Sequence, residues 1–271
     1  MPQWECGKDQ LSSAASVRSL VAPFGDVRGI YFDLDDTLCG YWDASKAGLR
    51  ATFEACPVPH TSSDEMINHW AAAFREFCPS LKRTAWYSLY LKDSGTTRTE
   101  LMRLTLEKAG VLDTELAALL SATYMRERDS KLKLFPDATA LLGQLNPDLK
   151  LGLITNGPAD LQRMEIETLG LTAQFEHIFI EGELGVGKPE AEVFLKARLA
   201  MDLEPNEILF VGNSFEHDIR PAISNGWRTA WIRRESDVPP SAHGVVSKPE
   251  EHPAGAPMPD LIVNDLTELL N

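Results

Sequence analysis

The stretch GIYFDLDDTL, residues 29–38, decides how the rest of the sequence is interpreted. An apolar run typical of a buried strand ends directly in three aspartates, Asp33, Asp35 and Asp36. If the backbone stays extended past the strand, Asp33 and Asp35 face one side and Asp36 faces the other. Two convergent carboxylates repel each other and favour a hard cation such as Mg²⁺ between them. The alternative is a turn or a helix N-cap formed by Asp36 or Thr37.

Five further apolar runs predict the other strands of a sheet. They lie at residues 149–155, 177–182, 207–212, 228–232 and 260–265. Stretches with helical spacing separate most of them, and this alternation predicts an α/β fold with a Rossmann-like parallel sheet and helices on both faces. Ligands of such sheets bind at the carboxyl ends of the strands. The three aspartates lie at one of these ends.

One long interval breaks the alternation of strands and helices. Residues 40–133 contain several helical patterns and no convincing strand, which predicts a small all-helical domain inserted after the first strand. We expect the α/β core in residues 28–39 and 134–271, preceded by an N-terminal extension of residues 1–27. Within this core, residues 235–259 are rich in Pro, Gly and Ser and predict a surface loop.

The composition narrows the class of protein. The chain has 271 residues with 44% hydrophobic residues and a formal net charge of −14, which argues against a nucleic-acid partner. Its four cysteines form no CxxC pair, so a structural zinc site and a disulfide framework are both weakly supported. No stretch resembles a signal peptide or approaches the roughly 18 apolar residues of a membrane span. We therefore expect a cytoplasmic protein with no membrane partner.

Two other strand ends carry groups that suit a phosphate. Thr155 and Asn156 offer a hydroxyl and an amide to phosphate oxygens, although a plain turn is the alternative. Lys188 lies in GELGVGKPE, residues 182–190, which has the glycine and lysine spacing of a P-loop. Pro189 stands where the P-loop needs a Ser or Thr hydroxyl, and it also lacks a backbone N–H, so we exclude an ATPase. Lys188 is then either a cation at the site or a solvated loop lysine.

A further strand end carries potential metal ligands. Asn213 and Asp218 follow the apolar run in LFVGNSFEHDI, residues 209–219. A side-chain carbonyl and a carboxylate can both ligate a hard cation or hold its bound water. A helix N-cap is the alternative for either residue.

Together these motifs make the chain resemble the haloacid dehalogenase (HAD) superfamily, in particular its phosphatase branch with a helical cap inserted after the first motif. The family's D-x-D-x-T motif matches residues 33–37, its threonine matches Thr155 and its lysine matches Lys188. Its fourth motif, G-D-x-x-x-x-D, matches residues 212–218 with asparagine in place of the first aspartate. The resemblance covers about residues 28–232 and resumes in the last strand.

The resemblance implies a mechanism. Asp33 would attack phosphorus to form an aspartyl-phosphate, and Asp35 would protonate the leaving oxygen and later activate water. The phosphate oxygens would be held by Lys188, Thr155 and Asn156. Mg²⁺ would be held by Asp33, the backbone carbonyl of Asp35, Asn213 and Asp218. Because Asn213 carries one negative charge fewer than the usual aspartate, we expect a raised Mg²⁺ requirement.

Asp35 favours a phosphatase over a dehalogenase, because a dehalogenase has no leaving alcohol to protonate. We therefore expect a Mg²⁺-dependent phosphatase, a monomer or homodimer, that acts on a small phosphorylated metabolite such as a sugar phosphate or nucleoside monophosphate. Two alternatives remain open: a β-phosphoglucomutase-like phosphomutase, and a catalytically weak or non-catalytic HAD-like binding protein, which only Asn213 supports.

The helical insertion supplies the residues expected to contact the leaving group. The candidates are Tyr41, Trp42, Arg75, Lys82, Arg83 and Lys92. The aromatic residues Trp70, Trp86 and Tyr87 have helical spacing and are expected to form the core of the insertion. His60 and His69 are assigned no role, since a zinc site needs further ligands.

Overall fold

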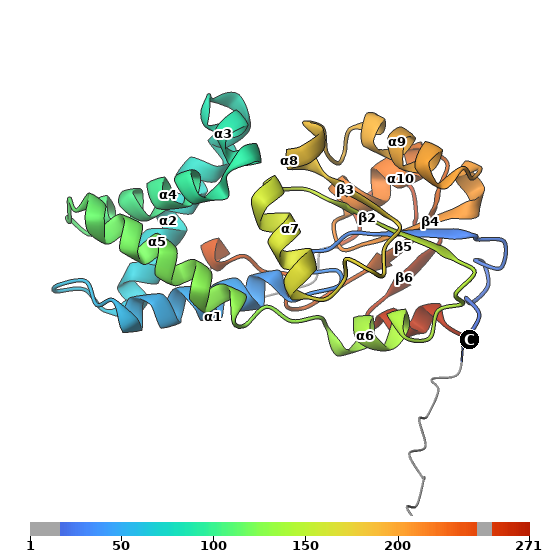
Figure 1. Ribbon diagram of the computed structural model, residues 1–271, viewed down its shortest axis with the longest axis horizontal. Helices are drawn as coiled ribbons and strands as arrows, with labels where there is room; N and C mark the ends of the chain where they lie inside the picture. The colour runs from blue at the N-terminus through green and yellow to red at the C-terminus, as the bar shows by residue number, and fades with distance from the viewer. Residues whose placement is uncertain (1–16, 243–250) are drawn as a thin grey trace, which may run out of the picture.

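The computed structural model describes residues 17–242 and 251–271, so Cys6, most of the N-terminal extension and part of the predicted loop lie outside the described residues. Six parallel strands form one sheet in the order β3-β2-β1-β4-β5-β6 (Figure 1). This confirms the predicted α/β, Rossmann-like fold. The strands are β1 (Gly29–Phe32), β2 (Lys150–Thr155), β3 (His177–Ile180), β4 (Ile208–Gly212), β5 (Arg228–Ile232) and β6 (Leu261–Val263).

Both faces of the sheet are covered, because the strands are apolar on both sides. In β1, Ile30 and Phe32 pack into a cluster with α6 (Pro136–Leu142) and α7 (Ala159–Thr168). Tyr31 points to the opposite face and packs with residues of α9 (Ala191–Met201) and α10 (Arg220–Ser224). This alternation with a period of two residues gives the sheet a helical layer on each side.

The strand order places a topological switch at the centre of the sheet. The chain runs from β1 outward through β2 to β3, and then returns to start again at β4 on the other side of β1. Loops that leave β1 and β4 therefore diverge, and the crevice between them is where ligands of open parallel sheets bind. Asp33 directly follows β1, and Asn213 directly follows β4.

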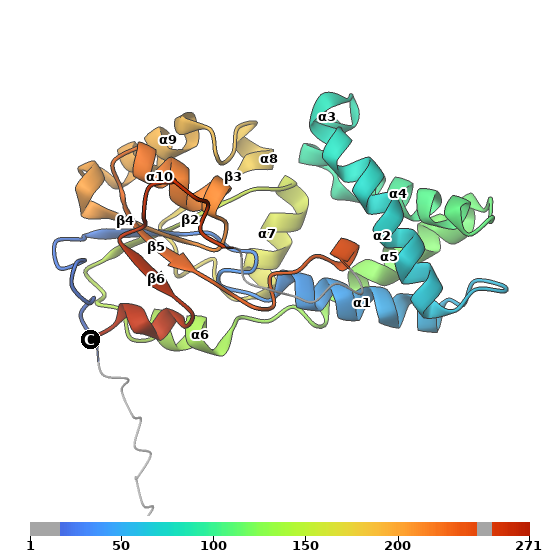
Figure 2. The same ribbon diagram turned by 180° about the vertical axis from the view of Figure 1, so that it is seen from behind.

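Residues between β1 and α6 form a separate helical region at one side of the sheet (Figure 2). Its core contains Phe53, Trp70, Met102 and Leu120. Local signals fix the helix ends: Ser62 forms a capping box with Glu65, and Asp93 and Asp113 cap the helices that follow them. The helices are α1 (Tyr41–Ala55), α2 (Ser63–Phe77), α3 (Trp86–Lys92), α4 (Ser94–Lys108) and α5 (Thr114–Asp129), with a 3₁₀ segment η1 (Cys78–Arg83).

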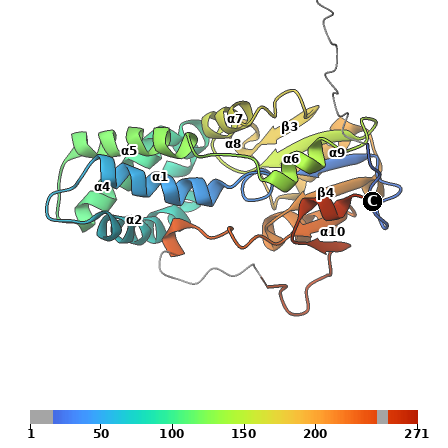
Figure 3. The same cartoon turned by 90° about the horizontal axis from the view of Figure 1, so that it is seen from below.

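Two neighbouring stretches of chain join the helical region to the core. Gly40 donates to the Lys133 carbonyl at 3.2 Å, and Phe135 donates to the Leu38 carbonyl at 2.9 Å. Helices α1 and α5 extend side by side from this double connection (Figure 3). Gly48 permits their close approach, since a Cβ there would lie 2.9 Å from the backbone of Arg128.

The segment after β5 also reaches the helical region. Residues 235–242, predicted as part of a surface loop, lead into η4 (Pro240–Ala242), which packs against α1 and α2. Pro240 is buried, and Arg75 of α2 donates to the Ser241 carbonyl. This part of the predicted loop is therefore packed against another element.

The remaining short elements complete the core. They are α8 (Glu181–Leu184), η2 (Pro205–Glu207), a π-helical turn η3 (Phe215–Ile219) and η5 (Leu266–Leu269). Across residues 17–242 and 251–271, no helix combines the length and the apolar character needed to cross a bilayer.

We predict that Gly48→Ala destabilises the protein although alanine favours helices. The new methyl group would force α1 away from Arg128, and overpacking of this kind costs about 1–3 kcal/mol in free energy of unfolding. Urea denaturation measures the change. Gly25→Ala is the control, because no atom lies within 4 Å of its added Cβ. Equal stability of the two variants would contradict the close packing of α1 on α5.

Candidate active site

A buried lysine joins two aspartates at the carboxyl ends of β1 and β4. Lys188 Nζ lies 2.6 Å from Asp33 Oδ1 and 2.6 Å from Asp218 Oδ1. All three side chains are buried, so their charges interact strongly. Lys188 and Asp218 are 155 and 185 positions away from Asp33 in the sequence. All three meet at the switch point between β1 and β4, as expected from their places at strand ends.

Asp33 is fixed by hydrogen bonds from both neighbouring motifs. Its N–H continues the sheet ladder by donating to the Val211 carbonyl of β4 at 2.9 Å. Its Oδ2 accepts from Thr37 Oγ1 at 2.8 Å, and the same hydroxyl lies 3.1 Å from Asn213 Oδ1. Thr37 therefore connects the first motif to the fourth.

The position of the Asp218 side chain requires a glycine at the end of β4. Its Oδ2 accepts from the Ser214 N–H at 2.9 Å, while Oδ1 contacts Lys188. A Cβ on Gly212 would lie 2.5 Å from the Asp218 carboxylate. The glycine of the fourth motif thus leaves the space that Asp218 occupies.

Asn156 holds the backbone of Lys188. Its Nδ2 donates to the Lys188 carbonyl at 2.6 Å, and its Oδ1 accepts from the Lys188 N–H at 2.8 Å. The sequence suggested that this amide binds phosphate, but both ends of the amide are occupied by the lysine. In this structure, the Asn156 side chain positions the cation.

Asp35 belongs to a polar network that sequence reasoning missed. Its Oδ2 accepts from Gln162 Nε2 at 3.1 Å, and the same nitrogen donates to Glu165 Oε2 at 3.0 Å. Gln162 Oε1 in turn accepts from Thr155 Oγ1 at 2.6 Å, so this hydroxyl must rotate before it can donate to a phosphate. Glu165 forms a fully buried ion pair with Arg128 of α5, with 2.7 Å between Oε1 and Nη1.

One signal for this network exists in the sequence. Gln162 and Glu165 lie on the same face of α7 as the buried Leu161 and Ile166. Polar residues at inward positions of a helix mark buried networks. Arg128 carries a weaker signal of the same kind near the end of α5.

Asp36, the third aspartate after β1, is almost fully buried. It has a positive φ of 56°, and its Oδ1 accepts from the Trp42 N–H at 3.2 Å. Aspartate tolerates this left-handed conformation better than most residues. Asp36 thus shapes the turn from β1 toward α1, in agreement with the turn role considered for it.

Asn213 contacts a carboxylate that the sequence did not single out. Its Nδ2 donates to Asp237 Oδ2 at 2.7 Å, from the segment that follows β5. The backbone carbonyl of Asn213 accepts from Trp231 Nε1 at 2.7 Å. The bond to Asp237 fixes the orientation of the side-chain amide, with Oδ1 turned toward Thr37, and the bond from Trp231 holds the backbone.

The site carries more negative charge than its lysine neutralises. Burial raises the pKa of Asp218 to about 7 against the opposing effect of Lys188, and burial together with Asp33 raises the pKa of Asp35 to about 6. Burial alone would lower the pKa of Lys188, but Asp218 and Asp33 outweigh it and raise the pKa, so the lysine stays charged.

This donor set suits a divalent cation. Asp33, Asp35 and Asp218 oppose a single Lys188, and their remaining lone pairs are on oxygen, the ligand atom that Mg²⁺ prefers. Within the described residues, no group of three or more Asp, Glu, His or Cys side chains is arranged to hold a metal ion. A site here would therefore need the amide oxygen of Asn213 and a backbone carbonyl as well as carboxylates.

A cavity of about 360 Å³ lies between the helical region and the core. The core contributes Asn156 and Gly157 beside the site, together with Glu181. The helical region supplies the opposite walls, which include the aromatic residues Tyr41, Trp42, Trp70, Phe74, Phe77, Tyr87, Tyr90 and Tyr124. The cavity therefore lies between Asn156, which holds the backbone of Lys188, and the inserted helices.

Three of the six residues proposed to contact a leaving group line this cavity. Tyr41, Trp42 and Lys82 line the cavity, whereas Arg75, Arg83 and Lys92 are not among its lining residues. Trp70 is buried in the core of the helical region, as expected, and also lines the cavity. Arg98 lines the cavity too and was not predicted.

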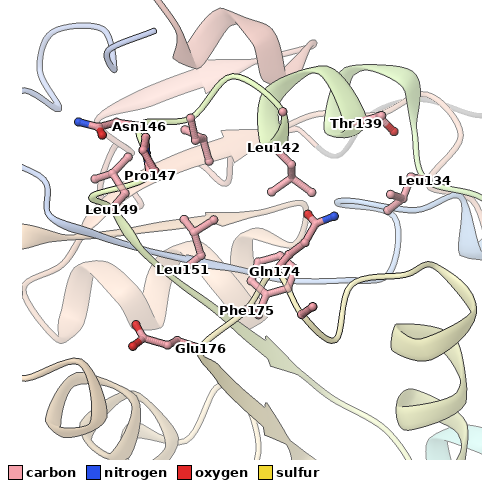
Figure 4. A pocket seen from close by; sticks show the side chains of 13 residues that line it. Leu134, Thr139, Leu142, Asn146, Pro147, Leu149, Leu151, Gln174, Phe175 and Glu176 are labelled. Carbon is pink, nitrogen blue, oxygen red and sulfur yellow. The ribbon is translucent and has the colours of Figure 1, made fainter. Parts of the chain in front are cut away.

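A larger cavity of about 650 Å³ lies at the opposite edge of the sheet. It is lined by Leu142, Leu149, Leu151 and Phe175 near the amino ends of β2 and β3 (Figure 4). Its walls are mostly apolar, and none of the aspartates or lysines of the site reaches it. The smaller cavity is lined by Asn156, which holds the backbone of Lys188, so we assign the chemistry to that side of the sheet.

Comparisons with known proteins agree with this geometry. A family model described as haloacid dehalogenase-like hydrolase matches residues 27–226, and a HAD-hydrolase-like model matches residues 185–269. The phosphoserine phosphatase of Thermus thermophilus is 32% identical over 85% of this chain and 84% of its own length. The N-acylneuraminate-9-phosphatase of Rattus norvegicus is 27% identical over 84% and 93%. Among solved structures, the HAD-hydrolase YfnB of Bacillus subtilis has a TM-score of 0.65 at 21% identity, covering 90% of this chain and 96% of that one.

We predict that Asp36 makes the protein less stable as pH rises. Burial, then Asp237 and Asp35, raise its pKa from 3.8 to about 9. Between these values the folded carboxyl keeps a proton that the unfolded one has lost, so the free energy of unfolding falls with rising pH, by up to about 1.4 kcal/mol per unit.

Asp36→Asn should flatten this dependence, since asparagine does not titrate and tolerates a positive φ. Urea denaturation at about pH 5 and about pH 8, in the presence of a chelator, measures it. A variant with the same pH slope as the wild type would show that Asp36 is already ionised when folded.

Proposed function

The chain belongs to the haloacid dehalogenase-like hydrolases, and from this premise we propose that it is a Mg²⁺-dependent phosphatase that hydrolyses a small phosphomonoester through a covalent intermediate on Asp33. The observation that carries the proposal is the pair of carboxylates after β1: Asp33 contacts Lys188, and burial, followed by the charge of Asp33, raises the pKa of the Asp35 carboxyl. Such a pair supplies a nucleophile and a proton donor side by side.

Asp33 is suited to attack phosphorus. Lys188 lies 2.6 Å from its carboxylate and presents a positive charge where the phosphate oxygens would gather. The Asp33–phosphorus bond forms while the bond from phosphorus to the leaving oxygen breaks. Once Thr155 rotates away from Gln162, its hydroxyl can donate to a phosphate oxygen, and backbone N–H groups near Asn156 can do the same.

Asp35 is suited to move the proton. With its pKa raised to about 6, a fraction of Asp35 is protonated near neutral pH and can donate to the leaving oxygen. The resulting carboxylate then accepts a proton from the water that attacks the aspartyl-phosphate, which releases phosphate and restores Asp33. Gln162 holds the carboxylate in place during both steps.

The donor set supports Mg²⁺ as the cofactor. Asp33, the Asp35 carbonyl, Asn213 and Asp218 would hold the ion, and when bound it would offset the repulsion between the anionic nucleophile and the phosphate. Two curated relatives are named as phosphatases acting on different compounds, which supports the reaction class and leaves the substrate open.

We predict that Asp33→Asn lowers kcat for p-nitrophenyl phosphate by about a thousandfold or more, because the amide is not a nucleophile. Asp35→Asn should cost about a hundredfold to ten-thousandfold through loss of proton transfer. Asp26→Asn, a change at an exposed position before β1, is the control. A beryllofluoride adduct on the wild type that is absent from Asp33→Asn would identify the nucleophile directly.

Unchanged turnover by Asp33→Asn would contradict the proposal. A requirement for an added sugar bisphosphate, with transfer of phosphate between sugar oxygens in place of release, would instead identify a phosphomutase.

A further prediction concerns Asn213 and Asp237. Asn213→Asp should replace a hydrogen bond by repulsion between two carboxylates, and a bound cation would relieve that repulsion. We therefore expect Mg²⁺ to raise the melting temperature of this variant more than that of the wild type. Asp237→Asn, which removes a charge, should show a smaller Mg²⁺ effect than the wild type. Equal shifts in all three proteins would place the cation away from Asn213.

A further inference from the structure

Arg98 is the feature of the cavity that the proposed mechanism does not use. It lies on the inward face of α4 together with Ser94, Thr97 and Leu101, all of which line the cavity. An arginine on such a face is normally held by a carboxylate, since burial of an unpaired charge is costly.

The other lysine and arginine side chains of the cavity, Lys82 and Arg128, have carboxylate partners. Lys82 lies 3.4 Å from Glu181, which also accepts from the Tyr87 hydroxyl. Arg128 pairs with Glu165 at 2.7 Å and with Asp129 at 2.6 Å. Their charges are therefore compensated within the protein.

Arg98 lacks such a partner in the described part of the chain. Its Nη1 contacts the Met125 sulfur, and its Nη2 donates to Ser94 Oγ at 3.2 Å. Its Nε is buried with no hydrogen-bond partner among the described residues. Asp160 attracts the guanidinium without contacting it, and Ser94 links the two because its hydroxyl donates to the Asp160 carboxylate at 2.8 Å. Both direct contacts of the guanidinium are thus with neutral groups.

A second donor on the same cavity wall is also unsatisfied. Trp70 Nε1 is buried with no hydrogen-bond partner in the described residues, and its ring stacks on Phe74 with 4.9 Å between centroids. Two N–H donors without acceptors, set in aromatic walls, suit a ligand with an apolar or flat body and acceptor oxygens.

We propose that the leaving group of the substrate carries a carboxylate that Arg98 binds, so that the substrate is the phosphate ester of an organic acid. This inference rests on the proposed phosphatase function and narrows its substrate class. A single guanidinium matches the single charge and planar shape of a carboxylate, whereas a second phosphate would bring a charge that Arg98 alone does not balance. Phosphate at Asp33 and carboxylate at Arg98 would place the body of the ester between the aromatic walls.

The test compares two esters of equal shape, 4-carboxyphenyl phosphate and 4-carbamoylphenyl phosphate. The measured quantity is the ratio of their kcat/KM values, in which general losses of activity cancel. Arg98→Met should lower the ratio of acid to amide by about tenfold to a hundredfold, the effect of losing a charged hydrogen bond. Arg98→Lys, which keeps the charge without the planar fork, should lower it less.

Arg103→Met is the matched control. Arg103 lies on the same helix, and its partners Glu100 and Glu107 are outside the cavity. Its substitution should leave the ratio unchanged. An equal loss for both esters in Arg98→Met would overturn the inference while leaving the proposed function intact, and would make Arg98 a structural link to Ser94.

A binding measurement separates the two proposals. Calorimetric titration with 4-hydroxybenzoate and 4-hydroxybenzamide needs no turnover. Preference of the wild type for the acid, lost in Arg98→Met, supports the inference even if neither ester is hydrolysed, a result that would overturn the proposed function alone. Equal binding of the acid and the amide by the wild type would overturn the inference. If circular dichroism shows that Arg98→Met does not fold, the ratio of acid to amide kcat/KM is measured for Arg98→Lys instead. A ratio equal to that of the wild type would then overturn the inference.

Discussion

The rest of the site depends on the buried contact of Lys188 with Asp33 and Asp218. Without the lysine, two carboxylates would lie buried and unpaired, which proteins tolerate only at a cost of several kcal/mol. Neighbouring residues therefore hold this lysine in a defined position. Asn156 binds both the N–H and the carbonyl of Lys188, and Gly212 leaves room for the carboxylate on its other side. One positive charge still opposes three carboxylates, which is the condition that makes the site receptive to both a divalent cation and a proton on Asp35.

The position of each site residue in the fold determines whether the sequence alone could predict it. Six site residues lie at the ends of strands or in the connections that follow them, namely Asp33, Asp35, Thr155, Lys188, Asn213 and Asp218. In a parallel sheet those positions converge whatever the details of packing, so a one-dimensional pattern was sufficient. The same reasoning located all six strands to within a few residues. It assigned the Asn156 amide to phosphate, because a sequence does not reveal that both ends of an amide are taken by one neighbouring backbone.

The residues that sequence reasoning missed come from helices and from an irregular segment. Gln162 and Glu165 project from α7, Arg128 from α5 and Arg98 from α4, and which surface each helix faces is set by tertiary packing. Their combined effect is a continuous buried path from Arg128 of the helical region, through Glu165 and Gln162, to Asp35. Because this path crosses from the helical region into the core, a movement of α5 would alter the surroundings of the carboxylate proposed to transfer the proton.

The segment after β5 gives Asn213 a physical context. Arg234 donates to the Thr37 carbonyl at 2.8 Å and pairs with Asp137, and three residues later Asp237 accepts from Asn213. Near its end, Ser241 accepts from Arg75 of α2. One short stretch therefore touches the first motif, the fourth motif and the helical region. An aspartate at position 213 would repel Asp237 and weaken this connection, whereas asparagine donates to it. The negative charge absent from position 213 is present at Asp237 instead, on a segment that also contacts the inserted helices, so the substitution and the packed segment are two parts of one arrangement.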